Sequence, residues 1–372
     1  MAGLHKEVSM QYHRIPYEKT RDFCIKVFQG YGFTETESTQ ITDVLLDADL
    51  CGIESHGIQR LIRYHHEVTE GYVKLEATPE VVKETPLSAT IEGHDAMGQV
   101  LSVKAMQMTI DKAKTYGVGI VAVRNSNHYG IAGYYTRMAA DAGLIGICMT
   151  NTEAIMVPTF GREAMLGTNP IAFSMPASPV PFTFDAATTV VPRGKLEVYA
   201  KRDGVIRDGW ALDEKGHPCT DASRVLGNII HKTGGGILPL GGAGEETSGY
   251  KGYGFGMLCE ICTGILSGGL TSNHVNRTPG RINTCHFFMA IDYSMFGEKE
   301  DLEKGLSTYL DEIRNSPKAE GADRIYIPGE KEYESRQKVL REGIPVNTKT
   351  YAEMQMIADY TGAADLLPEY LD

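Results

Sequence analysis

The pattern of apolar and polar positions predicts helices at both ends of the chain. Near the N-terminus, apolar residues recur at intervals of three and four, which is typical of amphipathic helices. Three short helices are expected there, the second beginning at the capping pattern Thr34-x-x-Glu37. The third carries "GIESHGIQRLIRYHHEV", residues 52–68. Charged helical sequence returns from Ser335, and a last helix at "VNTKTYAEMQMIADY" is expected to pack on the N-terminal helices.

The centre of the chain has a different pattern. Short apolar and β-branched runs predict strands at "SATIEG", "GIVAVRN", "LIGICMT", "PIAFSMP" and "HFFMAID", with helices near residues 101–115 and 131–142 between them. This alternation predicts a mixed α/β domain. We therefore expect two domains, a helical one formed by residues 1–78 with 331–372 and a mixed α/β one at residues 79–330.

Composition and charge narrow the class of protein. No run approaches the roughly 20 apolar residues of a membrane span, and the N-terminus lacks the apolar block of a signal peptide. The net charge of -12 opposes binding to phosphate backbones and anionic lipid, so we expect neither a nucleic acid nor a membrane partner. Seven scattered cysteines favour a reducing compartment, so a cytoplasmic location is expected.

Cys259 and Cys262 form a C-x-x-C pattern. They lie in "KGYGFGMLCEICTGILSGG", whose apolar spacing predicts a buried helix, and no second pair completes a zinc site. Core packing is the preferred interpretation, and no metal is expected.

The stretch at residues 52–68 carries the first candidate chemistry. His56, Arg60 and Tyr64 are four residues apart, so a helix would place them on one face. An arginine binds a carboxylate through paired charge-assisted hydrogen bonds, and an imidazole can give or take a proton near neutrality. This pair suits a 2-oxo or 2-hydroxy acid. The alternative is a surface helix rich in His and Arg, since His65 and His66 follow directly.

A second candidate follows the strand predicted at "GIVAVRN". A polar turn with Asn127 and His128 precedes a helix that begins near Ile131. The free amides of a helix's first turn favour anions, so a ligand group fits there. The alternative is that Asn127 caps the helix and His128 fills space.

Two further segments have polar residues next to strands. In "GREAMLGTNPIAFSMP", Thr168 and Asn169 precede Pro170, which biases Asn169 towards an extended backbone and leaves polar groups available to a ligand. In "FTFDAATTVVPRGK", an acid and small hydroxyl residues stand near Arg193 and Lys195. This segment could receive the phosphate and ribose of a nucleotide, or be a solvated turn.

The usual dinucleotide signature is missing. No G-x-G-x-x-G follows a first strand, so an ordinary Rossmann domain is disfavoured. A glycine-dense segment at residues 233–256 runs into the Cys259 helix, and a loop there is expected to meet a ligand.

Seven segments in order carry a family resemblance: "ESHGIQR", "NSNHYGIAGYY", "LGTNPIAF", "FDAATT", "GWALDEKGHPCTD", "YKGYGFGMLCEICTGILSGG" and "IPGE". From about residue 15 to about residue 330, the chain resembles the malate/L-lactate dehydrogenase family of non-Rossmann, nicotinamide-dependent oxidoreductases. Ureidoglycolate, sulfolactate and diketogulonate enzymes and a cyclic imino-acid reductase are among its members. The resemblance implies a homodimer of two-domain subunits, with the cofactor on a mostly antiparallel sheet and the substrate between domains.

The resemblance also implies roles for individual residues. His56 is similar to the proton donor and acceptor, and Arg60 to the carboxylate anchor, while His128 matches the residue with the proton-transfer role in some members. Ser55, Tyr64, Thr168 and Asn169 are expected in the substrate pocket. Cofactor contacts are implied for Thr152, Asp185, Ala186, Ala187, Thr188, Lys251, Gly252, Pro328, Gly329 and Glu330. The segment before Lys251 is longer than is usual in the family.

These observations lead to one main hypothesis and three others. We expect an oxidoreductase that transfers a hydride between NAD(P)H and a small 2-oxo or 2-hydroxy acid of the malate, lactate, sulfolactate or ureidoglycolate type. NAD is the expected cofactor, with NADP as the alternative. A cyclic imino-acid reductase needs the same carboxylate anchor. A metal-dependent hydrolase is disfavoured because H-E-x-x-H is missing, and a noncatalytic ligand-binding homologue is disfavoured by the two histidines and the arginine.

Overall fold

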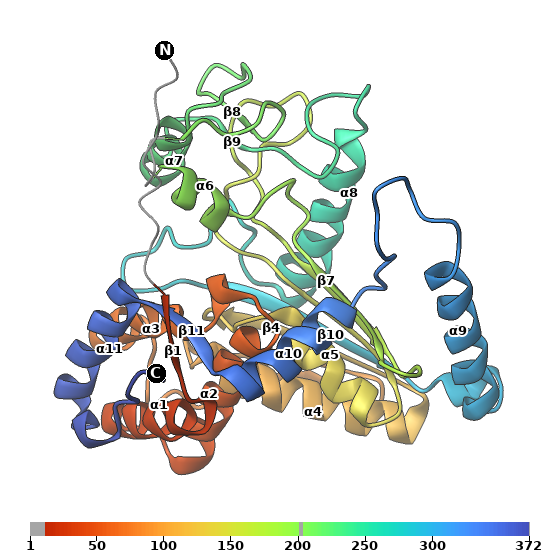
Figure 1. Cartoon of the computed structure of the whole chain (residues 1–372), viewed down its shortest axis with the longest axis horizontal. Helices are drawn as coiled ribbons and strands as arrows, with labels where there is room; N and C mark the ends of the chain where they lie inside the picture. Colours follow the sequence, from red (N-terminus) through yellow and green to blue (C-terminus); the bar gives the residue numbers. More distant parts are fainter. Residues whose placement is uncertain (1–11, 201–203, 372) are drawn as a thin grey trace.

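The computed structural model describes residues 12–200 and 204–371 and confirms a mixed α/β fold (Figure 1). Its main sheet has seven strands in the order β2-β3-β4-β10-β5-β6-β7. Within this sheet only β3 and β4 pair in parallel, and all other neighbours are antiparallel. The strands are β2 (Glu80–Glu84), β3 (Ser88–Glu92), β4 (Val118–Ser126), β5 (Ile145–Thr150), β6 (Ile171–Met175), β7 (Phe182–Ala186) and β10 (Thr284–Ile291).

Helices cover both faces of this sheet. Two of them, α4 (Gly98–Tyr116) and α5 (Ala132–Asp141), pack on one face and share a core with Val121 and Phe288 of the strands. On the other face lies α8 (Gly249–Glu260), which continues as a π-helical turn at Ile261–Ile265. The strands and helices predicted for the centre of the chain are confirmed. A further strand, β7, forms from "FTFDA", where no strand was predicted.

The two ends of the chain form one helical unit. Its helices are α1 (Tyr17–Tyr31), α2 (Glu35–Leu50), α3 (Leu61–Thr69), α10 (Glu330–Glu342) and α11 (Thr348–Thr361). They share a single core, and β1 (Tyr12–Ile15) pairs with β11 (Ile344–Asn347). The predicted packing of the C-terminal helices on the N-terminal ones is therefore confirmed. So is the capping box of α2, in which Thr34 and Glu37 bond each other's backbone amides.

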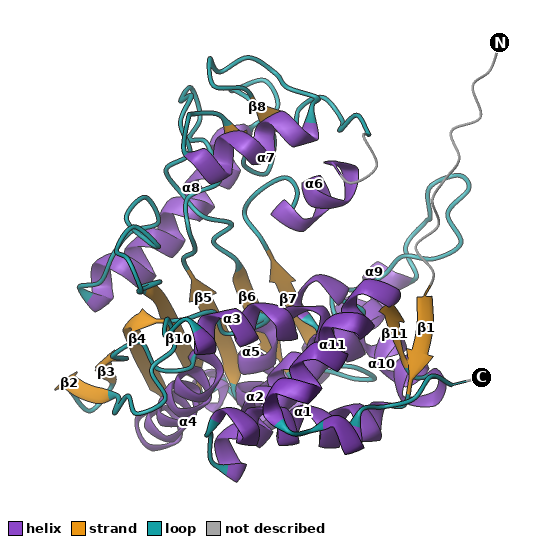
Figure 2. Ribbon diagram, turned by 90° about the vertical axis from the view of Figure 1, so that its left-hand side faces the viewer, coloured by secondary structure: helices purple, strands orange, loops and turns teal. Residues whose placement is uncertain are grey.

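A third group of elements forms a lobe beyond the sheet (Figure 2). It has its own core, which includes Leu196, Val225 and Ile237. The elements of this lobe are α6 (Arg193–Ala200), α7 (Ala222–His231), β8 (Ala211–Leu212) and β9 (Gly236–Ile237). The remaining long helix, α9 (Lys299–Arg314), follows β10 and a 3-10 turn at Tyr293–Phe296. No helix in the described part of the chain is long and apolar enough to cross a membrane.

The prediction of a buried helix at Cys259 is confirmed only for one side of the helix. Cys259 itself is buried, but Phe255 and Leu258 are each 49% exposed and Ile265 is 59% exposed. α8 contacts β5, and its buried residues are mainly the glycines Gly249, Gly252 and Gly256 together with Cys259. An apolar strip therefore faces outward.

Candidate active site

The stretch at residues 52–68 is not one helix, contrary to the prediction. Two separate 3-10 turns, η1 (Glu54–His56) and η2 (Ile58–Arg60), precede α3. They are divided at Gly57, whose φ is -85° and ψ is -148°. The helical path breaks because the Ile58 amide donates to the carboxylate of Asp49, at 2.7 Å, instead of a carbonyl of the preceding turn.

The two candidate histidines lie side by side nevertheless. The rings of His56 and His128 are 5.6 Å apart between centroids and 25° from parallel. Each uses Nδ1 for a hydroxyl of the protein: Ser55 Oγ lies 2.9 Å from His56, and the hydroxyl of Tyr64 lies 2.8 Å from His128. No described residue bonds to either Nε2, so both Nε2 atoms are available to a ligand.

Burial controls the charge of both rings. It lowers the pKa of His56 to about 4, and the charges of Arg60 and Arg63 act in the same direction. Burial lowers the pKa of His128 well below 6.5, again with help from Arg63, His56 and Arg60. Both imidazoles are therefore neutral at pH 7 and can accept a proton.

Arg60 provides a cation next to His56. Its Nε donates to the carbonyl of Ser55 at 2.5 Å, and no described carboxylate forms an ion pair with it. The arginine fork therefore keeps donors for an anion. Arg63, which the sequence reasoning missed, pairs with Glu67 at 2.6 Å and adds positive charge near both histidines. Its position one turn after Arg60 was the signal that could have identified it.

Three threonines of the predicted cofactor and substrate sets come together near the end of β7. The Thr168 amide donates to Thr152 Oγ1 at 3.0 Å, and Thr188 Oγ1 donates to the Thr168 carbonyl at 3.0 Å. Asn169 lies beside them but is fully buried, and its side-chain amide donates to the Gly256 carbonyl and to Glu260.

The predicted extended backbone at Asn169 is wrong. Its φ is 42°, in the left-handed region. The preference imposed by Pro170 is overcome because the Asn169 side chain is held at 2.7 Å by the buried carboxylate of Glu260 on α8. Asn is among the residues that adopt this conformation most readily.

The other predicted cofactor residues follow β7. Ala186 and Ala187 are half-buried at its end. On its far side, the Pro328 carbonyl accepts from the Thr183 amide at 3.2 Å, and Gly329 has a φ of 100° against the same strand. Glu330 holds this turn by ion pairs with Arg314 and Arg324, at 2.8 and 2.9 Å.

Of the two cofactor residues predicted on α8, the structure brings Gly252 close to the segment that follows β7, but not Lys251. A Cβ at Gly252 would lie 2.3 Å from the Leu240 amide nitrogen, and that amide donates to the Thr188 carbonyl. Lys251 is exposed, with Nζ 5.9 Å from the centre of the Tyr250 ring. The glycine therefore allows α8 to approach the segment that carries Thr188.

Two observations relate the segments around His128 and His56 to β7 and to the start of α6. Asp185 accepts from the Gly133 amide at 2.7 Å, at the start of α5, which follows the His128 turn. Burial raises the pKa of this carboxyl. At the start of α6, a Cβ at Gly194 would lie 3.9 Å from Ser55 Cβ. The segment after His128 is thus bonded to β7, and Ser55 lies close to the start of α6.

Asn127 does not cap α5, so the capping part of that alternative is wrong. The helix begins at Ala132, and the buried Asn127 amide instead donates to the Asp95 and Ala96 carbonyls. The proposed phosphate contacts at α6 already have partners: Arg193 pairs with Glu197 at 3.0 Å, and Lys195 lies 5.1 Å from the centre of the Trp210 ring.

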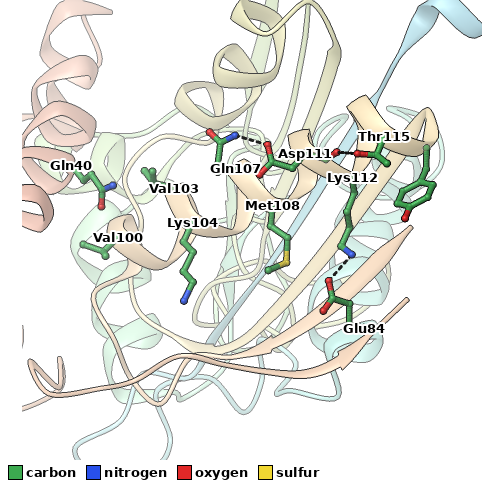
Figure 3. Close-up of a pocket in the computed structure, with 11 residues that line it drawn as sticks. Gln40, Glu84, Val100, Val103, Lys104, Gln107, Met108, Asp111, Lys112 and Thr115 are labelled. Carbon is green, nitrogen blue, oxygen red and sulfur yellow. Dashed lines mark hydrogen bonds and ion pairs between the residues drawn. The ribbon is translucent and has the colours of Figure 1, made fainter. Parts of the chain in front are cut away.

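A groove on the surface lies away from these residues. The groove, about 760 Å³ in volume, runs along α4 beneath β2, where Lys112 and Glu84 form an ion pair (Figure 3). None of the predicted site residues lines this groove. Across the described residues, no group of three or more His, Cys, Asp and Glu side chains is placed to hold a metal ion.

Comparisons with known proteins agree with this fold. A family model described as malate/L-lactate dehydrogenase matches residues 15–355. A malate dehydrogenase of Pyrococcus abyssi is 44% identical over 96% of this chain and 98% of its own. An L-sulfolactate dehydrogenase of Methanocaldococcus jannaschii is 37% identical over 93% of this chain and 96% of its own. The crystal structure of malate dehydrogenase from Entamoeba histolytica has a TM-score of 0.91 at 35% identity, covering 95% and 99% of the two chains.

The fold is that of a dehydrogenase built on a mostly antiparallel sheet. The chain belongs to the malate/L-lactate dehydrogenase family and is an oxidoreductase.

Proposed function

We propose that this protein interconverts a small 2-hydroxy acid and the corresponding 2-oxo acid with NAD(P) as the cofactor. The observation that carries the proposal is the grouping of His56, His128 and Arg60. Both imidazoles have an available Nε2 atom, and the guanidinium forms no ion pair with a described carboxylate. The family gives independent support.

Arg60 would receive the substrate carboxylate through paired hydrogen bonds, which fixes the position of the reacting carbon. A misplacement of about 1 Å can cost on the order of 100-fold in rate. When bound, the nicotinamide supplies or accepts the hydride at that carbon. In oxidation, the hydroxyl proton passes to the neutral imidazole at Nε2, and in reduction the imidazolium returns it to the oxygen.

His56 and His128 both satisfy the geometry for this proton transfer, so each is tested separately. His56→Gln and His128→Gln keep a polar side chain but remove the titratable ring. The histidine that moves the proton is the one whose loss lowers kcat in both directions by about 100- to 10,000-fold. The other is expected to change mainly the substrate KM.

The residues along β7 fit a dinucleotide. Half-buried Ala186 and Ala187 present little bulk, the threonine group offers hydroxyls, and Gly252 and Gly329 lie where a Cβ would meet backbone atoms. Thr152, Thr188 and Lys251 would hold the cofactor, and the helical part, residues 1–78 with 331–372, would form one wall of the substrate site as its own domain. We propose NAD as the cofactor, with NADP as the competing outcome of the test.

We further propose a homodimer. The apolar strip along α8, represented by Phe255, Leu258 and Ile265, is too exposed for a monomer's surface helix. A second copy of the chain would cover it. Leu258→Glu with Ile265→Glu is expected to give monomers in sedimentation experiments. The control Tyr309→Glu changes an equally exposed residue of α9 and is expected to leave the dimer intact.

The compartment is also a proposal. All seven cysteines are free thiols, which fits a reducing environment, and we propose the cytoplasm.

The deciding experiment is a screen of purified enzyme with NADH and NADPH against 2-oxo acids, including oxaloacetate, pyruvate and 3-sulfopyruvate. Turnover of an oxo acid with either cofactor supports the proposal. Turnover of a cyclic imine alone would make the protein an imino-acid reductase, and cofactor binding without any turnover would make it a binding protein.

A further inference from the structure

Asp49 is a buried acid that no step above uses. It lies next to the last residue of α2 and is 4% exposed. Its Oδ2 accepts from the Ile58 amide at 2.7 Å. No described Lys, Arg or His side chain pairs with it. A carboxylate in such a place is costly to bury, so a specific role needs to be found for it.

The neighbourhood of Asp49 points to the turns that carry His56 and Arg60. A Cβ at Gly57 would lie 2.0 Å from Asp49 Oδ1, so the carboxyl occupies the space that any other side chain at this position would need. The carboxyl thus packs against Gly57, the residue between η1 and η2. Its bond to Ile58 replaces the hydrogen bond that would have continued a helix through this point.

Two side chains also join the turns to each other: Gln59 Nε2 donates to the Glu54 carbonyl, and Arg60 Nε donates to the Ser55 carbonyl. The His56 amide donates to Ile53 and the Arg60 amide to Gly57, both within the segment itself. Ile53 is in turn joined to the Ala48 carbonyl of α2. Asp49 supplies the link from α2 to the second turn, so α2 fixes η1 through its backbone and η2 through this side chain.

We propose that Asp49 is a positioning residue that sets the angle between the two turns, so that His56 and Arg60 face the same substrate. In one continuous helix the two residues would lie on one face, one turn apart along the axis. With the break at Gly57, the Arg60 side chain folds back to the Ser55 carbonyl beside His56. This inference rests on the proposed function, and it names the residue that orients the acid–base group His56 and the anchoring group Arg60.

Substitution by Leu tests the proposal, because it keeps the number and branching of the side-chain heavy atoms, removes the acceptor and puts methyl groups in place of the oxygens. A methyl group needs about 3.5 Å from its neighbours, whereas Asp49 Oδ2 stands 2.7 Å from the Ile58 nitrogen. The second turn must therefore move by on the order of 1 Å, which is expected to lower kcat/KM for the acid about 100-fold. Asp49→Asn retains an acceptor oxygen and is expected to stay within about tenfold of the wild type.

A matched control comes from the outer lobe. Asp213 is also a buried acid that holds a turn, accepting from the Lys215 and His217 amides at 2.9 and 3.0 Å. Asp213→Leu is expected to lower the melting temperature but to leave kcat/KM near that of the wild type. For all three variants, the dissociation constant of the reduced cofactor is measured by its fluorescence and is expected to change less than about threefold for Asp49→Leu.

Crystal structures of Asp49→Leu and Asp49→Asn complete the test. The proposal requires displaced His56 and Arg60 side chains in the first and retained positions in the second. An unmoved turn in Asp49→Leu overturns it, as does a parallel loss of cofactor affinity and activity in Asp49→Leu and Asp213→Leu. If the wild type turns over no acid or imine, the proposed function fails, while the crystal structures still decide whether Asp49 positions these residues.

Discussion

The hydrogen bond between Tyr64 and His128 makes a sharp prediction. Tyr64 is fully buried, and its hydroxyl lies 2.8 Å from His128 Nδ1. Tyr64→Phe removes this oxygen and little else. It leaves a ring nitrogen without its partner in a place that water reaches poorly, which costs about 1–3 kcal/mol. If this free energy is lost in the transition state and not in the ground state, kcat drops by about 5- to 150-fold.

The pair formed by Tyr31 and His65 is a matched control. The Tyr31 hydroxyl lies 2.7 Å from His65 Nδ1, and both residues are buried in the helical core. His65 directly follows Tyr64 in the chain, but its ring contacts Tyr31, His66 and Tyr360 and neither His56 nor His128. Tyr31→Phe is therefore expected to cost a similar free energy of unfolding but to leave kcat unchanged.

The assay is steady-state turnover in both directions, with chemical unfolding measured on the same samples. Tyr64→Phe should lower kcat far more than it changes the KM of the acid, because the carboxylate anchor is intact. Equal losses of kcat in Tyr64→Phe and Tyr31→Phe would refute the reasoning, since the effect would then be one of stability. So would an unchanged kcat in Tyr64→Phe.

Four other outcomes are expected. Arg60→Ala should lower kcat/KM for the acid by about 10- to 150-fold while cofactor affinity is retained. Arg60→Lys should recover only part of this activity, because an ammonium lacks the planar fork of a guanidinium. An equal loss of cofactor affinity in Arg60→Ala would contradict the role of Arg60 as the carboxylate anchor. Because the pKa of His56 is about 4 and that of His128 is also low, kcat/KM for oxidation should be flat above about pH 5 and that for reduction should rise as the pH falls towards 4. The free energy of unfolding should fall as the pH drops from 6.5 towards 4, because the unfolded chain binds the proton more tightly; a pH-independent unfolding curve over this interval would oppose it. Gly252→Ala should lower the melting temperature and weaken cofactor binding, because the added Cβ would collide with the backbone of Leu240. Gly305→Ala, in open space on α9, is the control and should gain about 1 kcal/mol of stability. Similar melting temperatures for the two variants would argue against the collision with Leu240.

Local patterns were sufficient for elements whose conformation is decided by their own residues. The strands of the central sheet have runs of apolar, β-branched residues, and β10 is buried on both faces as its sequence "TCHFFMAI" suggests. The capping box at Thr34 lies within four residues of chain. The order of seven short segments also identified the family.

Long-range contacts decided the rest. Periodicity predicts one helix through His56 and Arg60, but a carboxylate from α2 takes the Ile58 amide and divides it. Pro170 favours an extended Asn169, yet Glu260, which is 91 residues further along the chain, holds that side chain in a left-handed conformation.

The sequence by itself determined the family of this protein, and it singled out the arginine, the two histidines and the small polar residues to which the proposed chemistry is assigned. Which ring nitrogens stay available, how far burial lowers the two histidine pKa values, and which side of α8 is left uncovered were decided only by the tertiary structure. Each of these depends on atoms that are distant in the chain and adjacent in space. The pattern of residues along the sequence does not specify which of them become neighbours.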